Sequence, residues 1–150
     1  MQEHLLVPID GSEQAREAFE YALDRFPDAE LTLLSVVDPA DAVVSEPITG
    51  AYESPAGTAG AGAELLNELE TTATERVEET ASEARAAGHD ADSEVVVGQP
   101  GRAIVVFADE RDCDHIVMGS HGRSGVSRVL LGSVAESVMR RAHAPVTVVR

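Results

Sequence analysis

The residues best suited to chemistry are glycines and hydroxyl side chains that follow a short apolar run near the C-terminus. The run is Asp114–Met118, and Gly119, Gly122 and Gly125 come soon after it. Glycine lets the main chain turn sharply and lets a ligand approach within van der Waals contact. The Ser120 hydroxyl and the N–H groups of such a turn can donate hydrogen bonds to phosphate oxygens. The pattern predicts a buried strand followed by an anion-binding turn.

A helix start is predicted a few residues further on. Gly132 and Ser133 precede residues 134–141, whose composition favours a helix. Ser133 is suited to an N-cap, and Glu136, three residues later, would complete a capping box. The N-terminus of this helix would present N–H groups and the positive end of its dipole to the same turn. Together the two elements predict a cradle for an anionic ligand.

The elements that must position this cradle alternate along the rest of the chain. Short apolar runs predict strands, and apolar residues at helical spacing predict the helices between them. We expect strands at about 3–9, 31–37, 92–97, 114–118 and 145–149, and helices at about 13–25, 64–87, 102–111 and 134–141. This alternation predicts one α/β domain over residues 1–150, with an open parallel sheet and helices on both of its faces.

The segment from about Asp38 to Gly62 interrupts the alternation. It contains clustered prolines and glycines among many alanines, and such residues break regular structure. We predict a long flexible loop at about 38–62, with at most a helical turn inside it. Loops of this length are usually either functional or disordered.

The charge of the chain excludes one class of function. There are 27 acidic residues against 11 basic ones, a net charge of −16, and every basic residue is arginine. Nucleic-acid binding needs a basic face, so no nucleic-acid partner is expected. An acidic surface without lysine fits a protein kept soluble in a salt-rich cytoplasm, where screening removes its self-repulsion. We therefore predict a halophilic source.

The single cysteine and the hydropathy pattern point to the cytoplasm. Cys113 cannot form an internal disulfide and has no catalytic partners near it in the sequence, so a structural role is expected. No apolar run approaches the length of a membrane span, and the N-terminus lacks a signal-peptide pattern. No membrane association is predicted.

The spacing Gly119-x2-Gly122-x9-Gly132-Ser133 resembles the ATP-binding signature of the universal stress protein family, in the subclass that binds nucleotide. The resemblance covers about residues 3–150. It implies a Rossmann-like, adenine nucleotide alpha-hydrolase-like fold whose five-stranded sheet has the strand order 3-2-1-4-5. It also implies that ATP is the ligand, with Mg²⁺ or Mn²⁺.

The resemblance assigns the site residue by residue. Pro8, Ile9, Asp10 and Val36 would border the adenine and ribose, with Met118 beside them. Asp10 can accept hydrogen bonds from ribose hydroxyls or reach a divalent metal through water. The phosphates would be held by Gly119, Ser120, His121, Gly122, Arg123, Gly132, Ser133, Val134 and Ala135.

Several of these residues also have a purely structural interpretation. Asp10 before Gly11 and Ser12 is a typical turn former, and Gly132-Ser133 can be an ordinary helix start. His121 can be a simple loop donor. The remaining histidines are scattered along the sequence, so no zinc site is expected. A phosphate loop of the Walker type is excluded because it requires lysine.

Three functions stay open. The first is a regulatory, ATP-binding stress-response protein with slow or partner-dependent hydrolysis. The second is a true ATP hydrolase or phosphotransferase, in which Asp10 or His121 acts on water or on the Ser120 hydroxyl. The third is a nucleotide-free interaction module. A homodimer is expected in each case, because the last strand would lie at a sheet edge and the family commonly dimerises there. Its residues are Val146, Thr147, Val148 and Val149.

Overall fold

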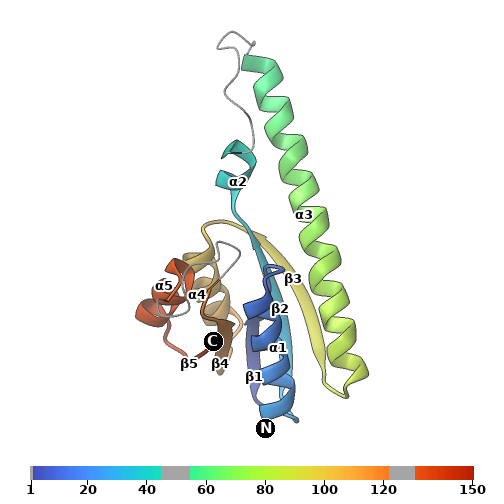
Figure 1. The fold of residues 1–150 in the computed structure, drawn as a ribbon, viewed down its shortest axis with the longest axis vertical. Coiled ribbons are helices and arrows are strands. Elements are labelled where there is room, and N and C mark those ends of the chain that lie inside the picture. The colour runs from blue at the N-terminus through green and yellow to red at the C-terminus, as the bar shows by residue number, and fades with distance from the viewer. Residues whose placement is uncertain (1, 45–54, 122–130) are drawn as a thin grey trace.

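A parallel five-stranded sheet forms the centre of the computed structural model, which describes residues 2–44, 55–121 and 131–150. The strands are β1 (His4–Pro8), β2 (Glu30–Val37), β3 (Ala91–Val97), β4 (His115–Gly119) and β5 (Val146–Val149). Their spatial order is β3-β2-β1-β4-β5, which confirms the predicted order (Figure 1). β1 lies between β2 and β4, with Leu5 opposite Leu31 on one side and opposite His115 on the other.

Helices follow the strands in the expected sequence. They are α1 (Glu13–Arg25), α2 (Pro39–Val44), α3 (Pro55–Ala86), α4 (Pro100–Glu110) and α5 (Ser133–Arg141). α1 begins where the Ser12 hydroxyl accepts a hydrogen bond from the Ala15 N–H at 3.1 Å, which makes Ser12 its N-cap. α4 begins with Pro100, whose missing N–H costs nothing in a first helical turn.

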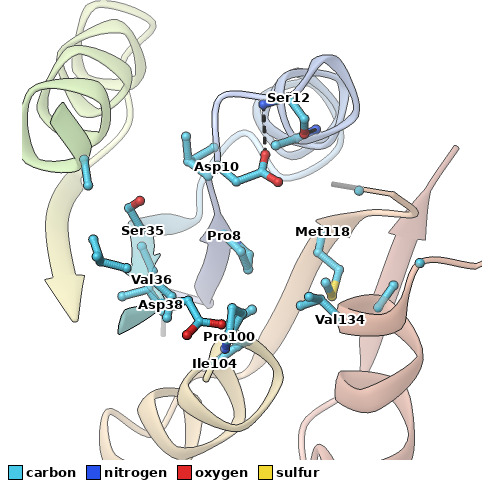
Figure 2. A pocket seen from close by; sticks show the side chains of 18 of the residues that line it. Pro8, Asp10, Ser12, Ser35, Val36, Asp38, Pro100, Ile104, Met118 and Val134 are labelled. Atoms are coloured by element: carbon cyan, nitrogen blue, oxygen red, sulfur yellow. Dashed lines mark hydrogen bonds between the residues drawn. The ribbon is translucent and has the colours of Figure 1, made fainter. Parts of the chain in front are cut away.

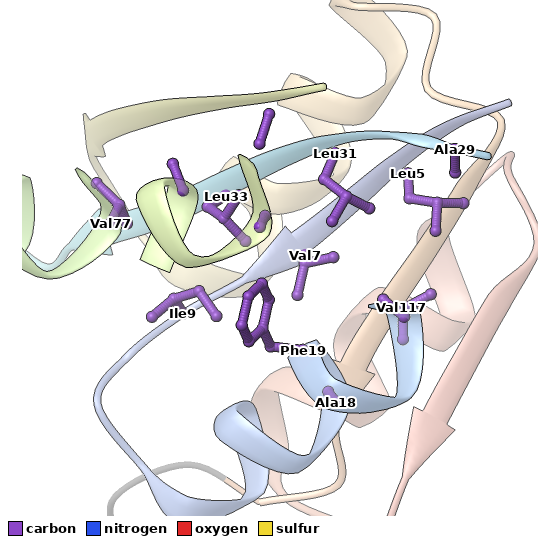
Figure 3. Packing of buried hydrophobic residues seen from close by; sticks show 14 residues of the cluster. Leu5, Val7, Ile9, Ala18, Phe19, Ala29, Leu31, Leu33, Val77 and Val117 are labelled. Atoms are coloured by element: carbon purple, nitrogen blue, oxygen red, sulfur yellow. The ribbon is translucent and has the colours of Figure 1, made fainter. Parts of the chain in front are cut away.

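Two hydrophobic cores lie on opposite faces of the sheet. Leu5 and Val7 of β1 point to the face that α1 and α3 cover, and Phe19 is buried there among strand residues (Figure 3). Leu6, between them in the sequence, belongs to the core under α4 and α5. Because alternate residues of a strand point to opposite faces, strands that are apolar throughout can serve both cores.

The predicted loop at 38–62 is wrong in most of its described part. Residues 39–44 form α2, and α3 begins at Pro55 instead of Glu64. Residues 45–54 lie outside the described residues. Pro55 suits a helix start, and the alanines between Gly57 and Gly62 favour helix. Extending an existing helix costs much less than nucleating one, so the strongly amphipathic part of α3 carries this weaker segment.

Candidate functional site

A cavity of about 320 Å³ lies at the carboxyl ends of the strands, where β1 stands between β2 and β4 (Figure 2). In open α/β sheets this rim is where ligands bind. Four elements contribute most of the wall: the loop after β1, the end of β2, the end of β4 with the start of α5, and one side of α3.

The loop after β1 is built around Asp10. One oxygen of its carboxylate accepts a hydrogen bond from the Ser12 N–H at 2.9 Å, which closes a tight turn. Gly11 occupies the turn with φ +83°, a conformation that side chains rarely adopt. Asp10 therefore has the turn-forming role that its sequence context suggested, and its carboxylate also lines the cavity (Figure 2).

The end of β2 supplies an apolar wall. Val36 faces Pro8, Pro100 and Ile104 across the cavity, and Met118 lies on the β4 side (Figure 2). Aliphatic side chains around main-chain hydrogen-bonding groups are the surroundings that suit a flat, partly polar ring. The part of the cavity beside Val36 can thus take a flat, partly polar heterocycle.

The end of β4 is polar and deeply buried. Ser120 and His121 are 3% and 5% exposed, and Ser120 Oγ lies 3.0 Å from His121 Nδ1. Among the described residues His121 Nε2 has no hydrogen-bond partner. A buried polar atom without a partner is costly, and a ligand that enters the cavity would supply a partner for this nitrogen.

The start of α5 differs from the prediction. Gly132, not Ser133, is the N-cap, and it makes no side-chain capping bond, so the predicted capping box with Glu136 is wrong. Gly132 is held instead by its N–H, which donates to the Ser120 carbonyl at 2.7 Å. This contact joins the end of β4 to α5 and turns the helix N-terminus, with its uncapped N–H groups, toward the cavity.

The cavity gathers every described residue that the sequence analysis placed in a nucleotide site. These are Pro8, Ile9, Asp10, Val36, Met118, Gly119, Ser120, His121, Gly132, Ser133, Val134 and Ala135. Gly122 and Arg123 lie outside the described residues.

The wall formed by α3 was missed by the sequence analysis. Leu69, Thr72, Ala73 and Arg76 line the cavity at the spacing i, i+3, i+4, i+7, which marks one face of a helix. The signal was present in the helical spacing of this segment, but spacing alone does not show which face of a helix meets the strand ends. Asp38 and Asp41, near the end of β2, also line the cavity.

The described residues show no ready-made metal centre and no membrane segment. Among them, no three histidine, cysteine or acidic side chains are grouped to hold a metal ion. No helix within the described ranges has the length and apolar character needed to cross a bilayer. Cys113 is buried just before β4, and this burial raises the pKa of its thiol to about 11, as expected of an unreactive structural cysteine.

Comparison with known proteins agrees with this fold. The family model described as the universal stress protein family matches residues 1–150. The universal stress protein MJ0531 of Methanocaldococcus jannaschii is 37% identical over 97% of this chain and 81% of its own.

Two solved structures extend the comparison. MJ0577, another universal stress protein of the same organism, superposes with a TM-score of 0.82 at 31% identity, over 99% of this chain and 96% of its own. A universal stress protein solved in complex with cAMP superposes with a TM-score of 0.62 at 26% identity, over 99% and 97%. On the family model and these relatives, the chain belongs to the universal stress protein family of stress-response proteins.

Proposed function

We propose that the protein is a regulatory ATP-binding protein of the stress response. One observation carries the proposal: a single cavity joins an apolar wall to the N-terminus of α5 through the buried Ser120–His121 turn. The apolar wall suits a base, and N–H groups at a helix start suit phosphate. A related protein was solved with cAMP, which supports an adenine nucleotide as the ligand.

The parts of ATP are assigned to the cavity by chemistry. The base would lie against Val36 and Met118, and the ribose hydroxyls would donate to Asp10. The phosphates would lie along Gly119–His121 and Gly132–Ala135, together with Gly122 and Arg123 of the glycine-rich turn. His121 Nε2 would then gain the hydrogen-bond partner that the described residues do not offer it.

A divalent ion fits this arrangement only as a partner of the ligand. Asp10 supplies a hard carboxylate oxygen, the ligand type that Mg²⁺ and Mn²⁺ prefer. The described residues hold no grouped metal ligands, so the ion would take its other ligands from phosphate and water. Its chemistry would be to neutralise phosphate charge next to Asp10.

Slow or partner-dependent hydrolysis is part of the proposal. The two bases named in the sequence analysis each make a local contact: one Asp10 oxygen accepts from the Ser12 N–H, and His121 Nδ1 lies against Ser120 Oγ. A general base must instead hold an attacking water in line with the phosphate. ATP would then act as a bound signal, whose presence changes the surface that a partner protein meets.

Thermal unfolding with nucleotides tests the proposal. At 100 times its dissociation constant a ligand stabilises the native state by about 2.7 kcal/mol, which is roughly 5–10 °C in Tm for a chain of this size. We expect ATP with Mg²⁺ in molar KCl to give such a shift. Gly132→Val should abolish it, because a Cβ there would lie 3.0 Å from the Ser120 carbonyl oxygen and 3.3 Å from His121 Cα.

Gly62→Val is the matched control, since nothing lies within 4 Å of a Cβ built at that position of α3. This variant should keep the full shift with ATP. Unchanged Tm of the wild type with ATP, ADP, AMP and GTP would instead favour the nucleotide-free interaction module.

The contact between Ser120 and His121 favours one alternative, a phosphotransferase. The hydroxyl and the ring nitrogen are 3.0 Å apart, the geometry in which an imidazole can accept a hydroxyl proton. This alternative predicts that incubation with Mg²⁺ and ATP adds the mass of one phosphoryl group, and that Ser120→Ala prevents it. An unchanged mass, with slow release of phosphate, would leave the regulatory function standing.

Dimerisation through β5 completes the proposal. β5 is an outer strand of the sheet that, within the described part of the chain, pairs with β4 alone, and its four residues are half-buried. The free edge of such an apolar strand can pair with the same strand of a second copy. This arrangement would hold two cavities in one particle.

A further inference from the structure

Arg76 lies on the α3 wall of the cavity, and it is the one arginine among the lining residues that the structure describes. It follows Leu69, Thr72 and Ala73 along the same helical face. The Thr80 hydroxyl donates to the Arg76 carbonyl at 2.9 Å, one turn further along the helix. Arg76 therefore lies in a regular part of α3 that packs on the core, so its main chain has a defined position.

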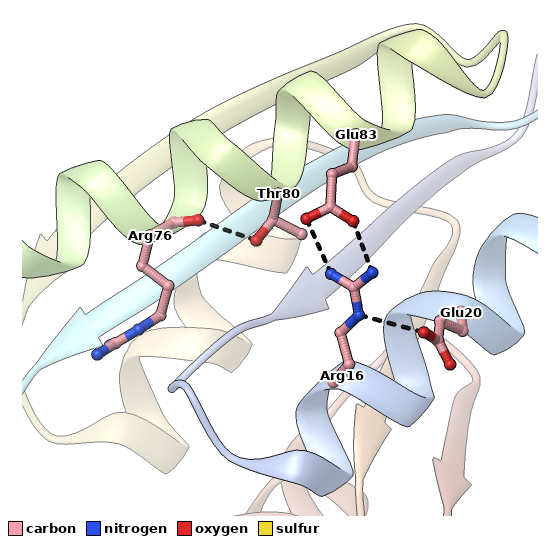
Figure 4. A network of polar contacts seen from close by, with 5 residues as sticks. All are labelled: Arg16, Glu20, Arg76, Thr80 and Glu83. Carbon is pink, nitrogen blue, oxygen red and sulfur yellow. Dashed lines mark hydrogen bonds and ion pairs between the residues drawn. The ribbon is translucent and has the colours of Figure 1, made fainter.

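The guanidinium of Arg76 lies against the loop after β1. A Cβ placed on Gly11 would be 2.9 Å from both Cζ and Nε of Arg76, so the glycine leaves the space that this side chain fills. Figure 4 shows Arg76 pointing away from Arg16, which makes a two-pronged ion pair with Glu83 on the surface. The Arg76 side chain thus reaches the rim beside the Asp10 turn.

Most of the charged side chains that line the cavity with Arg76 are acidic. Asp10, Asp38 and Asp41 all line the cavity, and the whole chain has a net charge of −16. A polyanionic ligand meets repulsion from these carboxylates. A guanidinium offers several N–H donors in a planar fork that matches phosphate oxygens.

We infer that Arg76 binds the charged part of the nucleotide from the α3 wall, beside the loop after β1. The inference rests on the proposed function and adds a specificity residue to it. The affinity should then depend on the phosphates: Arg76 strengthens the binding of ATP and ADP and has little effect on adenosine. It also couples the ligand directly to the long helix.

Isothermal titration calorimetry with ATP and adenosine tests this role in molar KCl with Mg²⁺. At this salt concentration the Debye length is about 3 Å, so general charge effects are screened and direct contacts remain. We expect Arg76→Gln to lower the affinity for ATP by about tenfold or more, because a charge-assisted hydrogen bond is lost. The same variant should lower the affinity for adenosine by less than about twofold. Arg25→Gln is the control, since it removes the same charge from the far end of α1.

Arg76→Lys provides a second variant, which keeps the positive charge and loses the planar fork of donors. Its affinity for ATP should lie between those of the wild type and Arg76→Gln. If both variants lose affinity for ATP and for adenosine by the same factor, Arg76 only shapes the cavity wall and the inference is wrong. If both bind ATP as wild type does, the inference is also wrong while the proposed function stands. A wild type that binds neither ligand would overturn the proposed function and the inference with it.

Discussion

Gly119→Ala should destabilise the fold, because the end of β4 lies directly against the main chain of α1. A Cβ at this position would be 2.7 Å from the carbonyl carbon of Gln14 and 2.8 Å from its oxygen. These are backbone atoms of a helix, which cannot rotate away as the end of a side chain can. The helix as a whole has to move.

The size of the effect follows from the required movement. Carbon atoms in favourable contact lie about 3.5–4.0 Å apart, so α1 must shift by roughly 0.8 Å or more. That helix buries Ala15, Ala18, Phe19 and Ala22, and the shift disturbs the core on one face of the sheet. Overpacking of this kind costs about 1–3 kcal/mol. We expect a loss near 3 kcal/mol, which lowers Tm by roughly 6–12 °C.

Thermal unfolding followed by circular dichroism at one fixed KCl concentration measures this loss. Gly98→Ala serves as the control, since a Cβ there has its nearest neighbour, the Cβ of Ala103, at an ordinary 3.7 Å. The control should melt within about 2 °C of the wild type. A Gly119→Ala protein that melts with the control would refute the close packing of β4 on α1. If the Gly119→Ala protein melts with the control and no longer binds ATP, Gly119 matters for the ligand and not for the stability of the fold.

Four further predictions concern charge, assembly and the single thiol. Tm should rise from dilute buffer to molar KCl, because salt screens the repulsion among 27 acidic residues; an equal Tm would contradict a halophilic source. Val148→Pro should give monomers in analytical ultracentrifugation, since it disrupts the outer strand, and an unchanged sedimentation coefficient would place the interface elsewhere. Hydrogen bonds from Arg16 lower the pKa of Glu83 below 4.5, so this group stabilises the fold at neutral pH and the benefit fades as the pH falls. The difference in unfolding free energy between wild type and Glu83→Gln, measured in urea, should therefore shrink from pH 7 to pH 4. Because the pKa of Cys113 is about 11, iodoacetamide at pH 8 should alkylate the native protein far more slowly than the urea-unfolded protein.

The strands and most helices could be predicted because their signals are local. The apolar runs of β1 and β2 continue through both faces of the strand, which is the pattern of a strand covered on both sides. The cap of α1 has an equally local signal, because Ser12 stands directly before an apolar stripe. In the structure its hydroxyl accepts a hydrogen bond from the Ala15 N–H. Such elements are decided by a few neighbouring residues.

The errors lie where a neighbour in space decides the outcome. Ser133 looks like an N-cap in the sequence, but the hydrogen bond from Gly132 to the Ser120 carbonyl fixes the helix start one residue earlier. The start of α3 was missed because Pro55 and the following glycines resemble a loop when they are considered without the helix that they extend. Arg76 resembles any charged residue on a helix surface, and only the folded chain brings it to the strand ends.

The length of α3 has a mechanical consequence. The helix spans 32 residues. Among residues 62–86, the buried apolar side chains are Ala73, Val77, Ala81 and Ala84, all in its C-terminal half, and the other half extends past the sheet (Figure 1). Ala73, where this burial begins, also lines the cavity, so a rigid tilt of the helix about this residue would move its N-terminal end. From Ala73 to Pro55 the lever arm is roughly 27 Å at 1.5 Å per residue. A tilt of about 5° about Ala73 would therefore move the Pro55 end by ~2 Å, so a small change at the cavity wall would be enlarged to the size of an atom at that end of the helix.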